Sequence, residues 1–354
     1  MTFPPIGRIP VIDLARLRGD SAERRALADD LTAVYHDIGF AVVVNHGLPD
    51  GYLDAIFEMM ETFFALPDDG KLLIDKTASR HFRGWEAVGT EYTNNRPDIR
   101  EQIDVWSEHT ARPIDVEPEY LRLLGPNQWM PDDVVAGQRS LTLDWFERLG
   151  GLADEVLSLF ALGLGLESDH FSSAFEGDSM SLTKFINYPP TPHGAAGVNA
   201  HHDAGFITLL AAGPTPGLQV LDPTGDWIDV PVVPDGLVLN IGEMLQAMTG
   251  NYLVATAHRV ITAEPRMSAA YFHGPTLDTP LDPIALAPRF VAAVAASERH
   301  REAGFMATKE QTEAGVPDMA SPTRVDTYGN QLWNYFHRSY PDMMRRHYGD
   351  AAPV

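Results

Sequence analysis

The stretch from residue 206 to 261 constrains the fold most, because it holds five short apolar segments at nearly even spacing. Glycine- and proline-rich turns separate several of them, at 213–217, 223–225 and 234–236. Short strands joined by such turns are typical of an antiparallel sandwich or jelly roll. We therefore expect a mainly β core with strands at 206–210, 218–221, 227–230, 237–241 and 254–261.

Two histidines and one aspartate bracket this stretch. His201 and Asp203 stand two residues apart just before it, and His258 lies near its end. In an extended chain, side chains at i and i+2 point to the same side, so His201 and Asp203 can converge on one ion while His202 faces away. Two histidines and one carboxylate are typical of an Fe(II) site that keeps three positions open for a co-substrate and O2. The alternative interpretation is two core histidines and a turn aspartate.

Composition excludes several other classes of function. The formal net charge is −23, which argues against nucleic-acid and anionic membrane partners. The chain contains no cysteine, so disulfides and thiolate metal sites are excluded. No apolar run approaches the roughly 20 residues of a membrane span, and the first residues lack the pattern of a signal peptide. We expect a cytoplasmic protein that acts on a small-molecule substrate.

Helical signals flank the predicted core on both sides. Asp20 and Glu23 form a capping-box pattern before an amphipathic helix, and a second helix is predicted from 52 to 66, before Pro67. Further expected elements are strands at 9–14, 39–44 and 181–188, irregular chain at 82–106, one or two helices at 132–166 and mainly helical chain after 280. The expected organisation is an N-terminal region at 1–125, a jelly-roll core at 178–278 and a C-terminal helical region at 279–354.

Eight segments carry a resemblance to a known family. They lie at 9–14, 39–47, 63–67, 201–210, 217–220, 240–246, 256–260 and 266–268. Together they resemble the isopenicillin N synthase-like family of 2-oxoglutarate/Fe(II)-dependent dioxygenases, over nearly the whole chain. Within that family, residues 271–273 and 334–342 are similar to bacterial ethylene-forming enzyme-type members.

The resemblance implies a fold, a metal and a reaction. The fold is a double-stranded β-helix (jelly roll) with helical flanks. Fe(II) is bound by His201, Asp203 and His258. With 2-oxoglutarate and O2 as co-substrates, and ascorbate as an auxiliary reductant, a small molecule is hydroxylated or desaturated while succinate and CO2 are released. Cyclisation, or fragmentation of 2-oxoglutarate itself, also occurs in the family, and the sequence does not choose among these outcomes.

The resemblance also assigns the co-substrate pocket. Arg266 and Ser268 stand at i and i+2, where a guanidinium and a hydroxyl can face the distal carboxylate of 2-oxoglutarate together. Tyr188, before a proline, matches a tyrosine that supports the co-substrate in plant-type members, while a strand tyrosine of the core is the alternative. The aromatic residues Trp333 and Phe336 belong either to the core or to the mouth of the pocket.

Two other functions remain open from sequence. The first is an Fe(II) oxidase of the same fold, similar to isopenicillin N synthase, that uses no 2-oxoglutarate. The second is a metal-free jelly-roll binding protein. Succinate production would identify a 2-oxoglutarate enzyme, and metal titration would exclude a metal-free protein.

Overall fold

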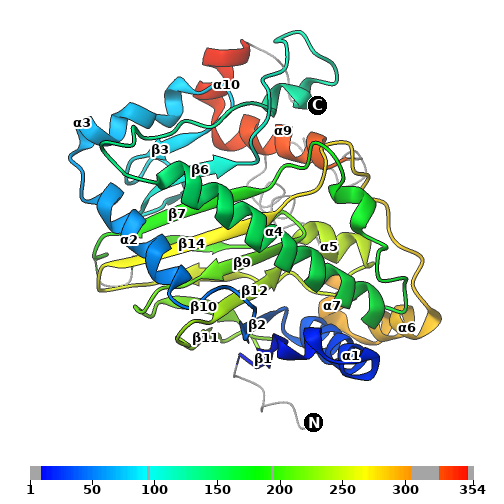
Figure 1. Cartoon of the computed structure of the whole chain (residues 1–354). Helices are drawn as coiled ribbons and strands as arrows, with labels where there is room; N and C mark the ends of the chain where they lie inside the picture. The colour runs from blue at the N-terminus through cyan, green and yellow to red at the C-terminus, as the bar shows by residue number, and fades with distance from the viewer. Residues whose placement is uncertain (1–8, 94–95, 193–194, 304–326, 350–354) are drawn as a thin grey trace.

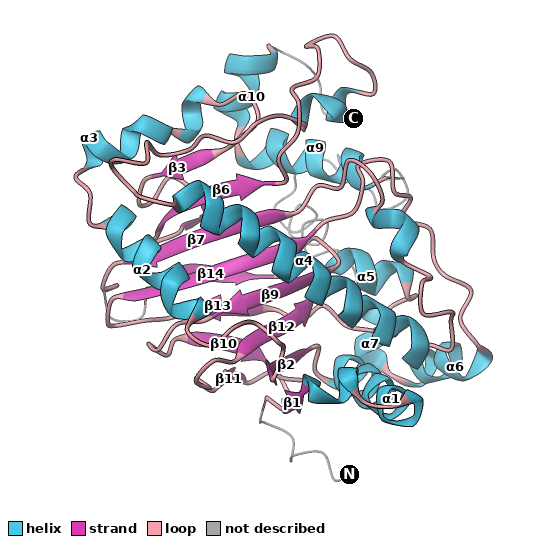
Figure 2. Ribbon diagram, viewed as in Figure 1, coloured by secondary structure: helices cyan, strands magenta, loops and turns pink. Residues whose placement is uncertain are grey.

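The computed structural model describes residues 9–93, 96–192, 195–303 and 327–349. A large sheet of eight strands forms its centre (Figures 1 and 2). In spatial order these are β1 (Val11–Asp13), β2 (Phe40–Val44), β12 (Leu237–Ile241), β9 (Ile207–Ala211), β14 (Arg266–His273), β7 (Leu182–Tyr188), β6 (Glu101–Trp106) and β3 (Gly84–Glu86). Neighbouring strands are antiparallel, apart from the parallel pair β1 and β2.

A smaller antiparallel sheet packs against one face of the large one. Its strands, in spatial order, are β11 (Trp227–Asp229), β10 (Leu218–Leu221), β13 (His258–Val260) and β8 (Val198–His201). An apolar cluster between the two sheets contains Ile186 and Val238 of the large sheet with Val220 and Val260 of the small one. The short hairpin of β4 (Tyr92–Thr93) and β5 (Arg96–Pro97) lies beside β8. Two facing sheets, antiparallel except for the pair β1 and β2, confirm the predicted mainly β fold with a jelly-roll core.

Helices cover the other face of the large sheet and the ends of the molecule. Figure 2 shows α2 and α4 lying across that outer face. Trp145 of α4 donates from Nε1 to Thr183 Oγ1 of β7 at 3.1 Å, whereas Ile186 of the same strand faces the smaller sheet. The described helices are α1 (Ser21–Asp37), α2 (Tyr52–Phe64), α3 (Asp68–Lys71), α4 (Gln138–Gly163), α5 (Glu243–Met248), α6 (Pro288–Ala296), α7 (Glu298–Glu302), α9 (Tyr328–Ser339) and α10 (Pro341–Tyr348).

The predicted start of the first long helix is confirmed in detail. Asp20 Oδ1 accepts hydrogen bonds from the backbone N–H groups of Ala22 and Glu23, both at 2.9 Å. Glu23 Oε2 in turn accepts from the backbone N–H of Asp20 at 3.1 Å. This reciprocal capping box satisfies N–H groups that have no partner within the helix, so α1 begins after Asp20.

Two predicted elements differ from the structure. The segment predicted as irregular, 82–106, contains β3 and the fully buried six-residue strand β6. In the segment predicted as one strand, 254–261, only His258–Val260 is a strand. Its first residues turn away from the sheet, because the backbone N–H of Val254 donates to Tyr35 O of α1 at 3.0 Å. The segment 304–326, predicted as helical, lies outside the described residues.

Candidate functional site

Two histidines and one aspartate meet between the sheets. His201 ends β8, His258 begins β13, and the two are direct partners in the register of the smaller sheet. Asp203 Oδ1 lies 3.7 Å from His201 Nε2 and 3.6 Å from His258 Nε2. One ligand-type atom from each residue lies within 4.8 Å of the other two. The fold thus brings together the three residues that the sequence predicts as metal ligands.

Each imidazole is held by the carbonyl two residues before it. His201 Nδ1 lies 2.9 Å from Asn199 O, and His258 Nδ1 lies 3.1 Å from Thr256 O. A carbonyl can only accept a hydrogen bond, so Nδ1 carries a proton and donates in both rings, which leaves Nε2 facing Asp203. Burial, followed by the nearby His258, lowers the pKa of His201 to about 3. His201 is therefore neutral at physiological pH, as a metal ligand must be.

The third group, Asp203, is oriented by two side chains of the large sheet. Its Oδ2 accepts from Thr208 Oγ1 at 2.6 Å and from Asn240 Nδ2 at 2.7 Å. Thr208 and Asn240 are register partners on β9 and β12. Burial acts to raise the pKa of Asp203, but His258, His201 and these hydrogen bonds outweigh it and hold the pKa below the ordinary value. Asp203 therefore presents an ionised Oδ1 to the two histidines.

The donor set fits Fe(II). Two imidazole nitrogens and one carboxylate oxygen face one point, and each ligand group has a hydrogen-bond partner on its other polar atom. The side chain of His201 is 30% exposed, against 5% for Asp203 and 11% for His258. The centre is therefore most open to solvent beside His201.

His202 points away from this centre, as predicted. Its Nδ1 lies 3.0 Å from Glu243 Oε1, at the start of α5. His46, the other histidine of the motif segments, binds Asp235 O through Nε2 at 2.7 Å and connects two loops. Neither residue belongs to the cluster of ligand-type atoms.

A buried arginine without a counter-anion lies on the same inner face of the large sheet. Arg266, the first residue of β14, is 2% exposed, and its Nε and Nη1 have no hydrogen-bond partner. No ion pair to Arg266 occurs among the described residues. Burial lowers the pKa of Arg266, although the adjacent Tyr188 opposes this. Burying an unpaired cation is costly, so the geometry is that of a site that gains an anion when a ligand binds.

Two further predicted residues lie beside this guanidinium. Tyr188 of β7 is the direct register partner of Arg266, and Arg266 Cζ lies 5.1 Å from the centroid of its ring. Ser268 follows on the same face of β14 and is 1% exposed. A carboxylate held by two donors of one guanidinium therefore has a hydroxyl and an aromatic ring as further neighbours.

Sequence reasoning missed the groups that support the ligands. Thr208 and Asn240 lie inside the segments that carry the resemblance, so a signal for them was present. A network of buried ion pairs on the inner face had no such signal. It joins Arg100 and Lys184 to Glu91, and Lys76 to Glu86 and Asp104, at 2.6–2.9 Å.

The aromatic residues of the C-terminal helix belong to the core. Trp333 and Phe336 are 0% and 1% exposed, and Phe336 stacks on Phe82 with ring centroids 4.1 Å apart. They form part of the apolar cluster that also contains residues of α4 and β6. This resolves the choice between core and pocket mouth in favour of the core.

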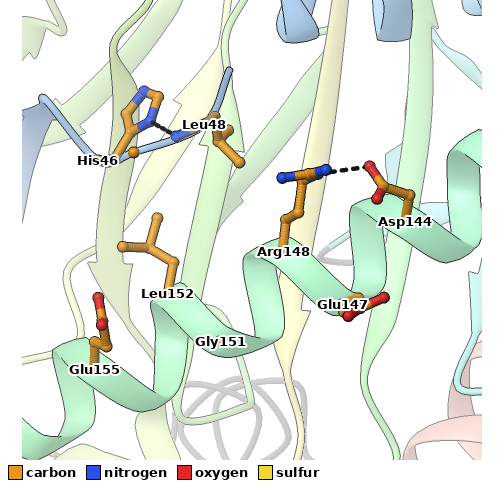
Figure 3. Close-up of a pocket in the computed structure, with 9 residues that line it drawn as sticks. His46, Leu48, Asp144, Glu147, Arg148, Gly151, Leu152 and Glu155 are labelled. Atoms are coloured by element: carbon orange, nitrogen blue, oxygen red, sulfur yellow. Dashed lines mark hydrogen bonds and ion pairs between the residues drawn. The ribbon is translucent and has the colours of Figure 1, made fainter.

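A surface pocket of about 380 Å³ lies elsewhere (Figure 3). Its walls are the loop at 46–48 and α4, where Arg148 pairs with Asp144 at 2.6 Å. Since α4 covers the outer face of the large sheet and the histidines lie on its inner side, the sheet separates this pocket from the candidate metal centre.

Comparisons with known families agree with this geometry. Residues 9–132 match the family model described as non-haem dioxygenase in morphine synthesis N-terminal. Residues 177–275 match the 2OG-Fe(II) oxygenase superfamily, and this range contains His201, Asp203, His258 and Arg266.

No described helix has both the length and the apolar character needed to cross a membrane.

Individual proteins are similar over most of their length. The 2-oxoglutarate-dependent dioxygenase frbJ of Dothideomycetidae sp. is 32% identical, over 76% of this chain and 75% of that protein. The homoarginine-6-hydroxylase 2-ODD-C23.1 of Arabidopsis thaliana is 29% identical, over 78% and 87%. A crystal structure of a full-length Neurospora crassa protein in complex with alpha-KG has a TM-score of 0.70 and 26% identity, over 85% and 94%.

Proposed function

This chain belongs to the 2-oxoglutarate/Fe(II)-dependent oxygenase superfamily, and we propose that His201, Asp203 and His258 are its iron ligands. The enzyme is a 2-oxoglutarate-dependent dioxygenase. The observation that supports the ligand assignment most strongly is the convergence of two Nε2 atoms on Asp203 Oδ1, at 3.7 and 3.6 Å. The iron, with 2-oxoglutarate and O2, supplies the oxidising chemistry that releases succinate and CO2.

The co-substrate pocket is formed by Arg266, Ser268 and Tyr188. The guanidinium of Arg266, which has buried nitrogens without a partner, donates to the distal carboxylate of 2-oxoglutarate, and Ser268 adds a hydroxyl. Tyr188 stacks against the guanidinium and closes one side of the pocket to water. The cation is desolvated before the ligand arrives, so its interaction with a carboxylate is stronger than it would be in water.

The primary substrate is a small molecule, and hydroxylation is the proposed outcome. A screen for substrate-dependent conversion of 2-oxoglutarate to succinate, with Fe(II) and O2 supplied, tests this. The screen includes homoarginine, because a similar protein is named a homoarginine-6-hydroxylase. Asp203→Ala is the matched negative control, since it removes the carboxylate ligand.

The expected result is one mole of succinate per mole of hydroxylated product. Oxidation of a substrate without consumption of 2-oxoglutarate would instead identify the same-fold oxidase. Absence of iron binding by the purified protein would identify a metal-free binding protein.

We further propose that the enzyme acts in the cytoplasm and is sustained by ascorbate. Fe(II) needs a reducing environment, and an auxiliary reductant restores iron that is oxidised when the reaction is uncoupled. Cell fractionation and turnover assays with and without ascorbate test the two statements. Recovery of the protein outside the cell would overturn the first, and equal turnover without ascorbate the second.

A further inference from the structure

The two histidines of the metal centre are held by their carbonyl partners in parallel ways. His201 binds the carbonyl of Asn199, and His258 binds the carbonyl of Thr256. Both carbonyl-bearing residues are anchored to the N-terminal region of the chain. Thr256 Oγ1 donates to Ile38 O at 2.7 Å, and Asn199 binds Asp98. The orientation of each imidazole therefore depends on a contact made about 100 or more residues away in sequence.

The contact between Asp98 and Asn199 involves a charged group. Asp98 Oδ1 accepts from the backbone N–H of Asn199 at 3.1 Å and from its side-chain Nδ2 at 2.9 Å. The other oxygen, Oδ2, accepts from Thr93 Oγ1 at 2.7 Å and lies 3.1 Å from Arg100 Nη2. Asp98 is 1% exposed. Its carboxylate thus has partners on both oxygens, and one oxygen binds Asn199, two residues before His201.

We propose that Asp98 is a positioning residue of the metal centre. It fixes the backbone of Asn199, whose carbonyl then holds the Nδ1–H of His201, so that Nε2 faces the metal. The proposal rests on the assignment of His201 as a ligand. Hydrogen bonds to an ionised carboxylate are shorter and stronger than those between neutral groups, so they suit a residue that has to hold a strand end in place.

His201 needs such an anchor more than the other ligands do. Its side chain is 30% exposed and lies on β8, the edge strand of the smaller sheet. His258 is more buried, lies on the inner strand β13 and packs against Phe40 with ring centroids 5.2 Å apart. A ligand on an edge strand with an open side has fewer neighbours that fix its rotamer. The buried carboxylate of Asp98 restrains the backbone of that strand instead.

Arg100 fixes Asp98 in turn. Its Nη2 lies 2.6 Å from Glu91 Oε2 as well as 3.1 Å from Asp98 Oδ2. Glu91 also pairs with Lys184 of β7 at 2.9 Å. The base of the β4–β5 hairpin is thereby joined to the large sheet, because Glu91 and Asp98 precede and follow the hairpin strands. The N-terminal third of the chain thus contributes to a metal centre whose ligands all lie beyond residue 200.

The test compares Asp98→Asn with a matched control, Asp222→Asn. Asp222 is also a buried carboxylate that accepts backbone N–H groups, from Thr224 and Asp226, but it does so in the turn between β10 and β11. Both substitutions keep size and shape and remove the charge. The measured quantities are the Kd of the metal-free protein for Co(II), from its visible absorption, and the tautomer of His201, from 15N NMR.

Asp98→Asn is expected to raise the Kd for Co(II) about 10–100-fold, the usual loss when a group behind a metal ligand is changed. It is also expected to mix the two His201 tautomers, whereas Asp222→Asn keeps wild-type values of both quantities. Once iron is saturating, the KM for 2-oxoglutarate stays unchanged in Asp98→Asn, because Arg266 and Ser268 lie on β14. Asn199→Ala removes the bonds from Nδ2, to Asp98 and more weakly to the carbonyls of Arg96 and Pro97, keeps the backbone bond to Asp98, and is expected to show a smaller rise in Kd.

Wild-type Co(II) affinity in folded Asp98→Asn would overturn the proposal. An equal loss of affinity in Asp222→Asn would also overturn it, because the effect would then be one of general stability. If Asp98→Asn does not fold, wild-type affinity in Asn199→Ala overturns it instead. Metal affinity is measured without 2-oxoglutarate. The result therefore does not depend on the co-substrate assignment, and a failure of that assignment can be distinguished from a failure of the Asp98 proposal.

Discussion

Replacing Arg266 by alanine tests the proposed co-substrate pocket at its buried guanidinium, which has no counter-anion among the described residues. Its Nε and Nη1 are buried and have no partner, so a carboxylate placed beside the guanidinium gains a charge-assisted contact. Such a contact contributes about 1.5–3 kcal/mol, and leaving the ligand carboxylate unpaired adds to the loss. At about 1.4 kcal/mol per decade, Arg266→Ala is expected to raise the apparent constant for 2-oxoglutarate by about one to two orders of magnitude.

Related variants should follow a graded order. Ser268→Ala removes one hydrogen bond to a charged group and should raise the apparent constant for 2-oxoglutarate least. Arg266→Lys should fall between Ser268→Ala and Arg266→Ala, because an ammonium keeps the charge and loses the planar fork. Arg259→Ala is the matched control. Arg259 also lies on a strand and stacks on an aromatic ring, with Cζ 4.1 Å from the centroid of Trp227, and it binds Gln219.

The assay is succinate formation as a function of 2-oxoglutarate concentration at saturating primary substrate, with the KM of that substrate measured separately. The KM of the primary substrate should stay close to the wild-type value in all variants. If Arg266→Ala weakens the primary substrate and leaves 2-oxoglutarate unaffected, the arginine binds the substrate instead. The enzyme would then resemble the oxidases that use no 2-oxoglutarate.

Three further outcomes are expected. His258→Ala should abolish Fe(II) binding measured by calorimetry, while the circular dichroism spectrum stays that of the folded protein. His202→Ala should keep most of the Fe(II) affinity. The reverse pattern would contradict the assignment of the histidines that face the metal. Burial, with Arg83 and Arg80 nearby, lowers the pKa of His81 from 6.5 to about 4. As the pH falls, the unfolded chain therefore binds a proton at His81 before the folded chain does. His81 should thus lower the free energy of unfolding, measured in urea, by about 1–2 kcal/mol from pH 7 to pH 5, and the fall should be smaller by that amount in His81→Gln. Arg266→Met, which removes a buried unpaired cation at similar volume, should leave the ligand-free protein at least as stable, but 2-oxoglutarate should no longer raise its Tm.

The convergence of His201 and Asp203 was predictable because it depends on the local alternation of an extended chain, whereas the return of His258 to the same point was implied by the resemblance. Alternation placed His201 and Asp203 on one side and His202 on the other, and the structure has His202 bound to Glu243. The capping box at Asp20 was equally local, since all of its partners lie within three residues. Patterns that depend on a few neighbouring residues are visible in the sequence.

Strand β6 was missed because its pattern resembles that of an exposed segment. Glu101, Gln102 and Asp104 are polar, and three of the six residues of the strand would ordinarily face water. In the fold Glu101 pairs with Lys71 at 2.9 Å and Asp104 pairs with Lys76 at 2.8 Å, while Gln102 donates to Asp104 at 3.0 Å. Partners that lie tens of residues away in the chain give no local signal, and the support of His201 by Asp98 escaped notice for the same reason.

The most direct test of the metal and co-substrate assignments is anomalous diffraction from crystals grown without O2 in the presence of Mn(II) and 2-oxoglutarate. The account predicts one anomalous peak bonded to His201 Nε2, Asp203 and His258 Nε2, with the distal carboxylate of 2-oxoglutarate on Arg266. A peak bonded to His202 and Glu243, or 2-oxoglutarate bound away from Arg266, would contradict it.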